Sequence, residues 1–237
     1  FNGMVMAQTG NRIAEQFSIT REEADLFAIE SHIRAHNAHK KGNFKEYHVA
    51  VEHEKGILNT DEGIRPNSSL ESLSALKPVF DENGVVTAGN ASQISDGAAA
   101  CLVMSRRKAE QLELTPLATV TGYCATGVDS VDVMSAPIPT VQKLWKMNNR
   151  EGEKDYDLYE HNEAFASASL GVMQGLNLKH EKLNVNGGAV AMGHPLGASG
   201  CRIVLALIHA LRQSGGKRGF ATACLGGGMA TAIELEI

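Results

Sequence analysis

The chain has 237 residues, a formal net charge of −5, and a composition rich in Gly in which aromatic residues make up only 5%. A chain of this length can bury a sizeable core in one large domain or two modest ones. Its slightly acidic balance does not predict the clustered basic face that binds nucleic acid, and no apolar run approaches the roughly 18 residues of a membrane span. We therefore expect neither nucleic acid nor a membrane as a partner.

The start of the chain and its cysteines bear on its cellular context. Phe1-Asn2-Gly3-Met4 lacks the charged and apolar regions of a signal peptide, and an opening without an initiator Met indicates a trimmed or partial chain. The cysteines are spaced neither as a CxxC metal site nor as a dense disulfide framework; they are Cys101, Cys124, Cys201 and Cys224. Reduced thiols and a cytoplasmic location follow as the expectation, with organellar targeting left open.

The first predicted helix begins after Thr20. Thr20-Arg21-Glu22-Glu23 has the pattern of a capping box, in which the Thr20 hydroxyl accepts from the Glu23 N–H and the Glu23 carboxylate accepts from the Thr20 N–H. We expect this helix to end near Gly42, because Gly is a common C-terminal stop. From Asn43 to Asn83 the pattern breaks up and predicts short strands and turns.

The rest of the chain changes character after Pro116. Before it, the small residues of Gly97-Ala98-Ala99-Ala100 predict a helix over 96–113. After it, predicted strands and helices alternate, which is typical of a layered α/β domain. The predicted strands are 120–123, 183–186, 220–224 and 229–235, the last two forming a terminal hairpin around Gly226-Gly227-Gly228. The predicted helices are 165–173 and 199–212, the second with Ile203, Leu207 and Leu211 on one stripe.

His194 lies in a segment, Gly187 to Gly200, that contains five glycines. Glycine allows close approach of the backbone, and Pro195 fixes the chain just after the histidine, so this loop can hold an imidazole rigidly at the start of a helix. An incidental histidine in a Gly-rich turn explains the spacing as well. A phosphate-binding loop is disfavoured, because neither GxGxxG nor GxxxxGK[ST] is present.

Other candidate groups have both a functional and a plain structural interpretation. Cys224 ends an apolar strand, where a thiol can face a cleft or remain a buried structural cysteine. Asn162-Glu163 precedes a helix and fits an N-cap with an acidic first turn. Three histidines share a helical face, but no Cys or carboxylate completes a zinc ligand set, so we expect a solvated face and no metal; they are His32, His36 and His39.

Four motifs stand in a fixed order along the chain. They are Thr87-Ala88-Gly89-Asn90-Ala91-Ser92, Asn162-Glu163-Ala164-Phe165, Gly193-His194-Pro195 and Cys224-Leu225-Gly226. This set resembles the thiolase signature, and the resemblance extends over essentially the whole chain. It implies a layered α/β C-terminal half with a mixed sheet, preceded by a mainly helical loop domain. The implied division is a loop domain on the CoA-binding side over 1–95, a returning segment of an N-terminal α/β half over 96–117, and the C-terminal α/β domain over 118–237.

The resemblance also implies a reaction. Thiolases carry out acyl transfer with Claisen condensation or thiolysis between acyl-CoA and CoA or acetyl-CoA; coenzyme A is a substrate and no tightly bound cofactor is needed. A cysteine from the N-terminal half attacks the thioester, and the residue matched by His194 activates it. The residue matched by Cys224 moves a proton on the second acyl group, provided that its surroundings lower the thiol pKa.

Further matched positions surround the reacting groups. One implied oxyanion hole combines His194 with a water held by Asn162, and the other uses the Gly226 N–H with that of the nucleophile. The resemblance places Ser92 near the pantetheine arm of CoA and Arg65 near its nucleotide end. Three positions match the lining of the acyl and pantetheine tunnel, with ordinary core packing as the alternative; they are Phe80, Met134 and Phe165. Gln93-Ile94-Ser95-Asp96 is closer to degradative 3-ketoacyl thiolases than to acetyl-specific biosynthetic ones.

None of the four cysteines matches the family's nucleophile. We therefore expect a fragment or one piece of a two-chain enzyme, which is inactive alone. It supplies the base and the second cysteine, and the nucleophile lies in an N-terminal half or a partner chain. We expect the complete enzyme to be a homo-oligomer. A non-catalytic CoA-binding or lipid-binding remnant is the alternative. A β-ketoacyl synthase normally has histidine where Asn162 stands, and sterol-carrier thiolase-like proteins depart from the intact Asn162-Glu163-Ala164-Phe165 motif.

Overall fold

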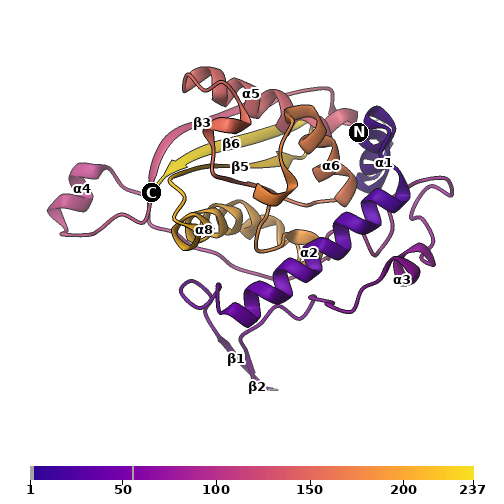
Figure 1. The fold of residues 1–237 in the computed structure, drawn as a ribbon, viewed down its shortest axis with the longest axis horizontal. Coiled ribbons are helices and arrows are strands. Elements are labelled where there is room, and N and C mark those ends of the chain that lie inside the picture. The colour runs from indigo at the N-terminus through magenta and orange to yellow at the C-terminus, as the bar shows by residue number, and fades with distance from the viewer. Residues whose placement is uncertain (1–2, 55) are drawn as a thin grey trace.

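The structure, a computed structural model, describes residues 3–54 and 56–237 (Figure 1). It begins with α1 (Met6–Phe17) and α2 (Arg21–Lys41). The predicted capping box of α2 is confirmed, with the Glu23 N–H 3.2 Å from Thr20 Oγ1 and the Thr20 N–H 2.7 Å from Glu23 Oε2. Gly42 ends the helix in the left-handed conformation with φ 76°, as glycine does without steric cost.

The segment after α2 is polar and has little regular structure. β1 (Val51–His53) and β2 (Gly56–Leu58) form an antiparallel hairpin that projects from the body at the bottom of Figure 1, and both strands are exposed. α3 (Leu70–Ser74) is a short helix whose N-terminus is capped by Ser69. The predicted short strands and turns are confirmed here, and α3 is an addition to them.

The predicted helix over 96–113 is largely wrong. Residues 92–105 have no helical structure, and the helical part of this region is α4 (Arg106–Gln111), which projects at the left of Figure 1. The backbone enters this segment paired with distant residues: the Ser92 N–H donates to the Ala164 carbonyl, and the Gln93 carbonyl accepts from the His194 N–H. These hydrogen bonds fix the start of the segment. Residues 96–105 are mostly exposed, so the helix propensity of the alanines, which is a weak preference, has no packing to support it.

A four-stranded mixed sheet in the order β3-β6-β5-β4 forms the centre of the molecule. β3 (Thr119–Gly127), β6 (Met229–Glu236) and β5 (Arg218–Leu225) are antiparallel neighbours, whereas β4 (Leu158–His161) pairs with β5 in parallel. The terminal hairpin β5–β6 is confirmed. The strand predicted over 183–186 is wrong, because Leu183 makes only an isolated bridge to Tyr159.

Helices cover the two faces of this sheet (Figure 1). α5 (Pro137–Met147) and α6 (Ala166–Leu176) pack on one face, where Val141, Leu144 and Val172 meet Phe220 of β5. α8 (Leu196–Ser214) packs on the other face through the predicted stripe, which is fully buried; it consists of Ile203, Leu207 and Leu211. Short helical turns connect these elements: η1 (Ser130–Ser135), η2 (Glu153–Asp155), η3 (His180–Lys182) and α7 (Ala189–Met192). The predicted layered α/β fold with a mixed sheet is confirmed.

The N-terminal helices pack directly on the sheet domain. α1 lies against α6 and η1, and the Ser167 hydroxyl of α6 donates to the Gly10 carbonyl of α1 at 2.8 Å. α2 lies against α6 and α7, and Arg34 Nη1 donates to the Leu183 carbonyl at 2.6 Å. The division of the chain at residues 95 and 117 stays a prediction, but its first and last parts share a common interface.

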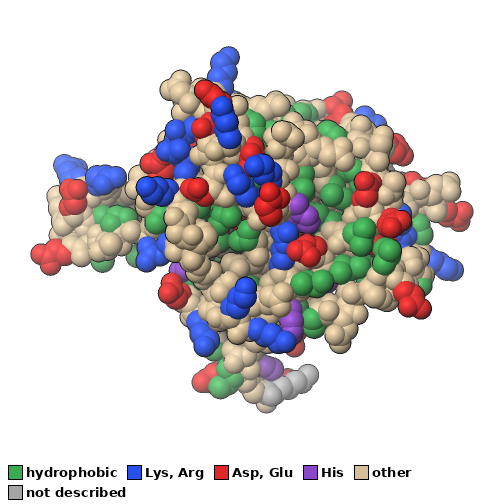
Figure 2. Space-filling view, viewed as in Figure 1, with side chains coloured by type: hydrophobic (Ala, Val, Ile, Leu, Met, Phe, Trp, Pro, Cys, Tyr) green, Lys and Arg blue, Asp and Glu red, His purple; other side chains and the backbone are tan. Residues whose placement is uncertain are grey.

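Acidic and basic side chains are interspersed over the face of the molecule seen in Figure 2, where α4 projects as a charged extension. This distribution agrees with the small formal net charge of −5. In the described part of the chain, none of the helices is both long and apolar enough to cross a membrane.

Candidate active site

Three of the four motifs meet around the carboxyl ends of two parallel strands. β4 ends at His161, and the next residue, Asn162, donates its N–H to the Thr222 carbonyl of β5 at 3.1 Å. Cys224 lies just beyond Thr222, near the end of β5. In open α/β sheets, ligands bind outside the carboxyl ends of the strands, so this edge is where a site is expected.

The fourth motif connects the other motifs to one another. The Ser92 N–H donates to the Ala164 carbonyl at 3.0 Å, and the His194 N–H donates to the Gln93 carbonyl at 3.1 Å. The Gln93 side-chain amide lies within 3.0–3.1 Å of the carbonyls of Gly63, Val190 and Ala191. Residues 92–93 therefore run between the Asn162 turn and the His194 loop and fix their separation.

A directed chain of hydrogen bonds passes through His194. His194 Nδ1 is 2.6 Å from Ser199 Oγ, and that hydroxyl donates to the Pro195 carbonyl at 3.0 Å. On the other side, Asn162 Nδ2 is 3.3 Å from His194 Nε2 and 3.4 Å from Nδ1, while Asn162 Oδ1 accepts from Arg202 Nη2 at 3.4 Å. The Pro195 carbonyl can only accept, so the Ser199 hydroxyl that donates to it accepts from His194 Nδ1–H; Asn162 Nδ2 lies almost equally far from both ring nitrogens and does not select between them. The proton of a neutral imidazole then lies on Nδ1, and Nε2 remains an acceptor.

The surroundings of His194 favour its neutral form. Burial lowers the pKa of the imidazole below its ordinary value, and the positive charge of Arg202 lowers it further. The same guanidinium faces Glu160, a fully buried carboxyl group whose pKa is raised to about 8 by burial despite the opposing effect of Arg202. At neutral pH, His194 can therefore accept a proton at Nε2 without first losing one.

Glu163 holds the loop that carries His194, and its predicted role as part of a helix N-terminus is wrong. The N-cap of α6 is Phe165, and no acidic residue lies in its first turn. The buried Glu163 carboxylate instead accepts from Ser31 Oγ at 2.7 Å, from Asn184 Nδ2 at 2.8 Å and from the Val190 N–H at 3.2 Å. Its hydrogen bonds therefore join α2, the segment before α7, and α7 itself.

The space around Glu163 leaves no room for a side chain at Gly188. A Cβ atom there would lie 2.2 Å from the Glu163 Cδ atom, far inside van der Waals contact. The Gly188 N–H also donates to Ser31 Oγ at 3.1 Å. This glycine lets the backbone of the His194 loop approach the carboxylate closely, which is one reason for the Gly-rich composition.

Cys224 lies in an apolar cluster rather than beside a cation. Its sulfur is 3.9 Å from Met134 Sδ, and it packs with Phe165, Ala164 and Ala168. Burial raises the pKa of this thiol to about 11, so the described surroundings do not lower it as the implied acid–base role would require. The thiol is protonated at neutral pH and can donate a proton, but it is not a standing thiolate.

The remaining predicted site residues lie at several places. Met134 and Phe165 share the Cys224 cluster, and Met134 is only 1% exposed, which fits core packing as well as a tunnel wall. Phe80 is 70% exposed, so core packing does not describe it. Arg65 lines a cavity of about 220 Å³ on the α2–α3 side together with His32 and Gln93. Gly226 lies exposed in the turn between β5 and β6.

Sequence reasoning missed Ser199 and Arg202. Both lie in the first turns of α8, where residues three positions apart share a face. That face turns toward His194 and Asn162, as their hydrogen bonds with these two residues demonstrate. The signal was present, since this polar pair follows Gly193-His194-Pro195 directly and precedes the apolar run from Ile203 to Ile208.

Comparison with known proteins agrees with this arrangement. The family model described as "Thiolase, N-terminal domain" matches residues 1–107, and the one described as "Thiolase, C-terminal domain" matches residues 114–237. The chain belongs to the thiolase family. The resemblance found in its motifs is thereby confirmed.

Curated relatives and solved structures match nearly the whole of this thiolase chain. An acetyl-CoA acetyltransferase of Chromobacterium violaceum is 44% identical and a probable acetyl-CoA acyltransferase of Staphylococcus aureus is 45% identical, each over 241 residues covering 100% of the chain and 61% of the relative. Human mitochondrial 3-ketoacyl-CoA thiolase in complex with CoA has a TM-score of 0.92 and 38% identity, covering 98% of this chain and 59% of that one. The Bacillus anthracis acetyl-CoA acetyltransferase has a TM-score of 0.93 and 39% identity, covering 98% and 60%.

The chain thus spans about 61% of the length of the curated relatives that it matches. The matched part contains the Asn162, His194 and Cys224 motifs.

Proposed function

We propose that this chain forms one wall of a thiolase active site, which transfers acyl groups between acyl-CoA and CoA or acetyl-CoA by Claisen condensation or thiolysis. The observation that supports this most is the contact of His194 Nδ1 with Ser199, whose hydroxyl donates to the Pro195 carbonyl, because it leaves the lone pair of Nε2 available as a base. A neutral imidazole with an accepting Nε2 is the base that a nucleophilic thiol requires, because a thiol is mostly protonated near neutral pH.

In the acylation step, His194 Nε2 takes the proton from the nucleophilic cysteine. The resulting thiolate attacks the carbonyl carbon of the acyl-CoA thioester, and the tetrahedral intermediate collapses as the carbon–sulfur bond to CoA breaks. The departing CoA thiolate then takes the proton back from the His194 imidazolium. Acyl-enzyme and free CoA are the products, and the imidazole is neutral again.

Cys224 acts on the α-carbon of the other acyl group. It does so in the step that forms the carbon–carbon bond in condensation and breaks it in thiolysis. In the thiolysis direction, the leaving acetyl-CoA carries its negative charge as an enolate, and its carbon needs a proton. The protonated thiol of Cys224 donates this proton, as its apolar surroundings favour. In the condensation direction the same thiol must first be deprotonated, which its raised pKa makes costly.

Oxyanion stabilisation and CoA binding complete the proposal. A water held by Asn162, together with His194, stabilises one developing oxyanion, and the Gly226 N–H contributes to the other. Ser92 and Arg65 lie on the CoA side, and the acyl and pantetheine groups contact the tunnel positions Phe80, Met134 and Phe165. No tightly bound cofactor takes part, and the enzyme works as a homo-oligomer.

In this proposal the nucleophilic cysteine is not one of the 237 residues of this chain and comes from an N-terminal half or a partner chain. Cys101 is exposed in the extended segment, and the Cys124 thiol donates to the Thr140 carbonyl inside the core. Cys201 lies on α8 and interacts with Cys101, and Cys224 already has a role in the second step. The chain alone is therefore inactive, although it supplies the base and the second cysteine.

The test is to follow acylation and condensation separately. Thiolysis of acetoacetyl-CoA by this chain alone should be undetectable, and measurable turnover would contradict an external nucleophile. In the protein that includes the nucleophile, His194→Ala should abolish acetyl transfer from acetyl-CoA to cysteine, measured by intact mass spectrometry. Cys224→Ala should keep that acylation and block condensation, with the exposed Cys101→Ala as a control that changes neither. Binding of CoA without acylation in the complete protein would favour a non-catalytic CoA-binding protein.

A further inference from the structure

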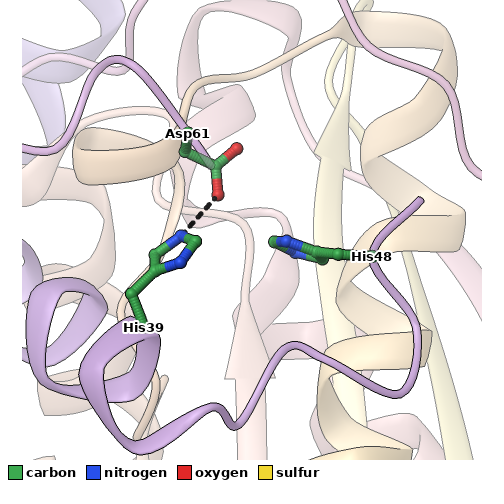
Figure 3. A group of neighbouring side chains, drawn as sticks. All are labelled: His39, His48 and Asp61. Atoms are coloured by element: carbon green, nitrogen blue, oxygen red, sulfur yellow. Dashed lines mark hydrogen bonds and ion pairs between the residues drawn. The ribbon is translucent and has the colours of Figure 1, made fainter. Parts of the chain in front are cut away.

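Three side chains with metal-ligating atoms meet at the base of the β1–β2 hairpin. His39 lies in the last turn of α2, His48 precedes β1, and Asp61 follows β2. Figure 3 shows the two imidazole rings and the carboxylate around a common space, and one ligand atom from each residue lies within 4.8 Å of the other two. This cluster differs from the helical histidine face considered from the sequence, because only His39 belongs to both.

We propose that His39, His48 and Asp61 bind one Zn²⁺ ion. Zinc binds imidazole nitrogen and carboxylate oxygen at about 2.0–2.2 Å, so a tetrahedral site places neighbouring ligand atoms about 3.3–3.6 Å apart. His39 Nε2 lies 3.4 Å from Asp61 Oδ2, which is the spacing of two adjacent ligands on such an ion. One ligand atom of His48 lies within 4.8 Å of both of these atoms, and the proposal requires His48 to move closer to them when the ion binds.

The chemistry of the ligands selects the metal. Two imidazoles and one carboxylate suit Zn²⁺, whereas Mg²⁺ and Ca²⁺ prefer sites made mainly of oxygen atoms. All three residues are half-buried, so an ion can reach them and a water can fill the fourth position.

Aromatic neighbours hold the two imidazoles in place. The His48 ring stacks on Phe44 with a centroid distance of 4.7 Å and an interplanar angle of 4°, and His39 meets the same phenyl ring edge-on at 4.7 Å and 62°. Phe44 itself is buried. Because one buried ring orients both histidines, little conformational entropy is lost when they bind an ion.

The position of the cluster indicates what the ion would do. His48 and Asp61 flank the hairpin on its two sides, and His39 anchors them to the end of α2. The strands of this hairpin are exposed and bury no core of their own. A bound ion would close the loop at its base and replace the missing core contacts, so the site is a structural brace for the projecting arm.

The experiment uses the purified chain without a polyhistidine tag, after chelator treatment and dialysis. Titration with Zn²⁺ in a calorimeter should give one equivalent of binding, and Co²⁺ should give the visible absorption of a tetrahedral site. His48→Phe keeps the stacking on Phe44, and Asp61→Asn keeps the size of the side chain. Removing a direct ligand should weaken Zn²⁺ binding by at least about 10–100-fold, the loss seen when only an outer-shell partner is removed.

A matched control is His36→Ala, which lies on the same helix outside the cluster and should bind Zn²⁺ like the wild type. In the wild type, Zn²⁺ should also slow proteolytic cleavage within residues 49–60, and both ligand variants should lose this protection. Absence of stoichiometric Zn²⁺ binding would overturn the proposal and leave an ordinary His39–Asp61 ion pair. Equal affinity in wild type and His48→Phe, or equal loss in His36→Ala, would place any bound ion elsewhere.

Discussion

The hydrogen-bond chain through His194 makes a prediction that needs no substrate. If the direction of the chain is as the Pro195 carbonyl requires, the neutral imidazole carries its proton on Nδ1, 2.6 Å from Ser199 Oγ. Ser199→Ala removes the acceptor of that proton and leaves the Pro195 carbonyl without the hydroxyl. The imidazole then loses the contact that selects one tautomer and orients the ring toward Asn162.

The size of the effect follows from the charge that develops on His194. A hydrogen bond between neutral groups contributes about 0.5–1.5 kcal/mol net, and one to a charged group contributes about 1.5–3 kcal/mol. Ser199 therefore stabilises the imidazolium more than the neutral ring by about 1–1.5 kcal/mol. Its removal should lower the pKa of His194 further and, in the complete enzyme, slow acylation by about tenfold, since each 1.36 kcal/mol is one factor of ten in rate.

Nitrogen NMR of ¹⁵N-histidine-labelled protein measures both the tautomer and the titration of His194. The wild type should show a protonated Nδ1 and an unprotonated Nε2 at neutral pH, and Ser199→Ala should show a mixture of tautomers and titrate at lower pH. Ser214→Ala, at the other end of α8, is the control and should leave both unchanged. A wild-type His194 protonated on Nε2 would refute the assigned direction of the chain.

Two further predictions concern buried ionisable groups. Arg150→Met should remove the nearest positive charge from the buried Glu234 carboxylate, leaving Arg218 at 4.0 Å, and lower the free energy of unfolding by up to about 3–5 kcal/mol in urea titrations. Burial alone would raise the pKa of Glu234, but hydrogen bonds from Arg150 and Tyr156 outweigh it and lower this pKa from 4.5 to about 2. The contribution of Glu234 to the free energy of unfolding is thus present above about pH 4.5 and lost as the pH falls toward 2. Glu234→Gln should remove this part of the pH dependence of unfolding. An unchanged pH dependence in the variant would contradict the prediction. Burial raises the pKa of Cys224 to about 11, so iodoacetamide should modify Cys224 far more slowly than the exposed Cys101 at pH 8. Its rate of modification, measured by peptide mapping, should rise as the pH approaches 11. Equal rates for the two cysteines at pH 8 would contradict the prediction.

Local signals predicted the elements whose stability is local. The capping box at Thr20 and the glycine at 42 are determined by hydrogen bonds within a few residues, and both formed as expected. The hairpin β5–β6 is likewise specified by its turn, and the apolar stripe of α8 by a regular spacing. In each case the local sequence carries the signal that sets the type of the element, although the stripe of α8 gains its stability by packing on the sheet.

Elements that depend on distant partners were missed. β4 reads as polar because it contains Glu160 and His161, yet all of its residues are buried. His161 Nδ1 lies 2.8 Å from Ser169 Oγ, and the His161 N–H donates to Asn184 Oδ1 at 2.9 Å, so these two groups have partners outside the strand, whereas the buried Nε2 atom has none among the described residues. The same dependence on distant residues fixes the start of the extended chain after Ser92, whose first hydrogen bonds are made to the Ala164 and His194 segments.

The motifs identify the candidate site residues Asn162, His194 and Cys224, and their catalytic roles stay predictions. The sequence could not show that one buried side chain, Glu163, joins the Asn162 turn to Asn184 and to Val190 in the segment before His194. Nor could it supply the sign of the Cys224 pKa shift, because that sign depends on which side chains surround the sulfur. The apolar residues that do so come from α1, η1 and α6.

Desolvation acts in opposite directions on the two groups that would move protons. It lowers the pKa of the His194 imidazole and raises the pKa of the Cys224 thiol, so both are uncharged at neutral pH. One group is therefore ready to accept a proton and the other to donate one. Under the proposed function this pairing suits thiolysis, in which a thiol loses a proton and the departing acetyl-CoA carbon gains one. Condensation would require a thiolate at Cys224, and the described surroundings of its sulfur are apolar, so a charge that favours this thiolate has to come from the substrate or from residues outside this sequence.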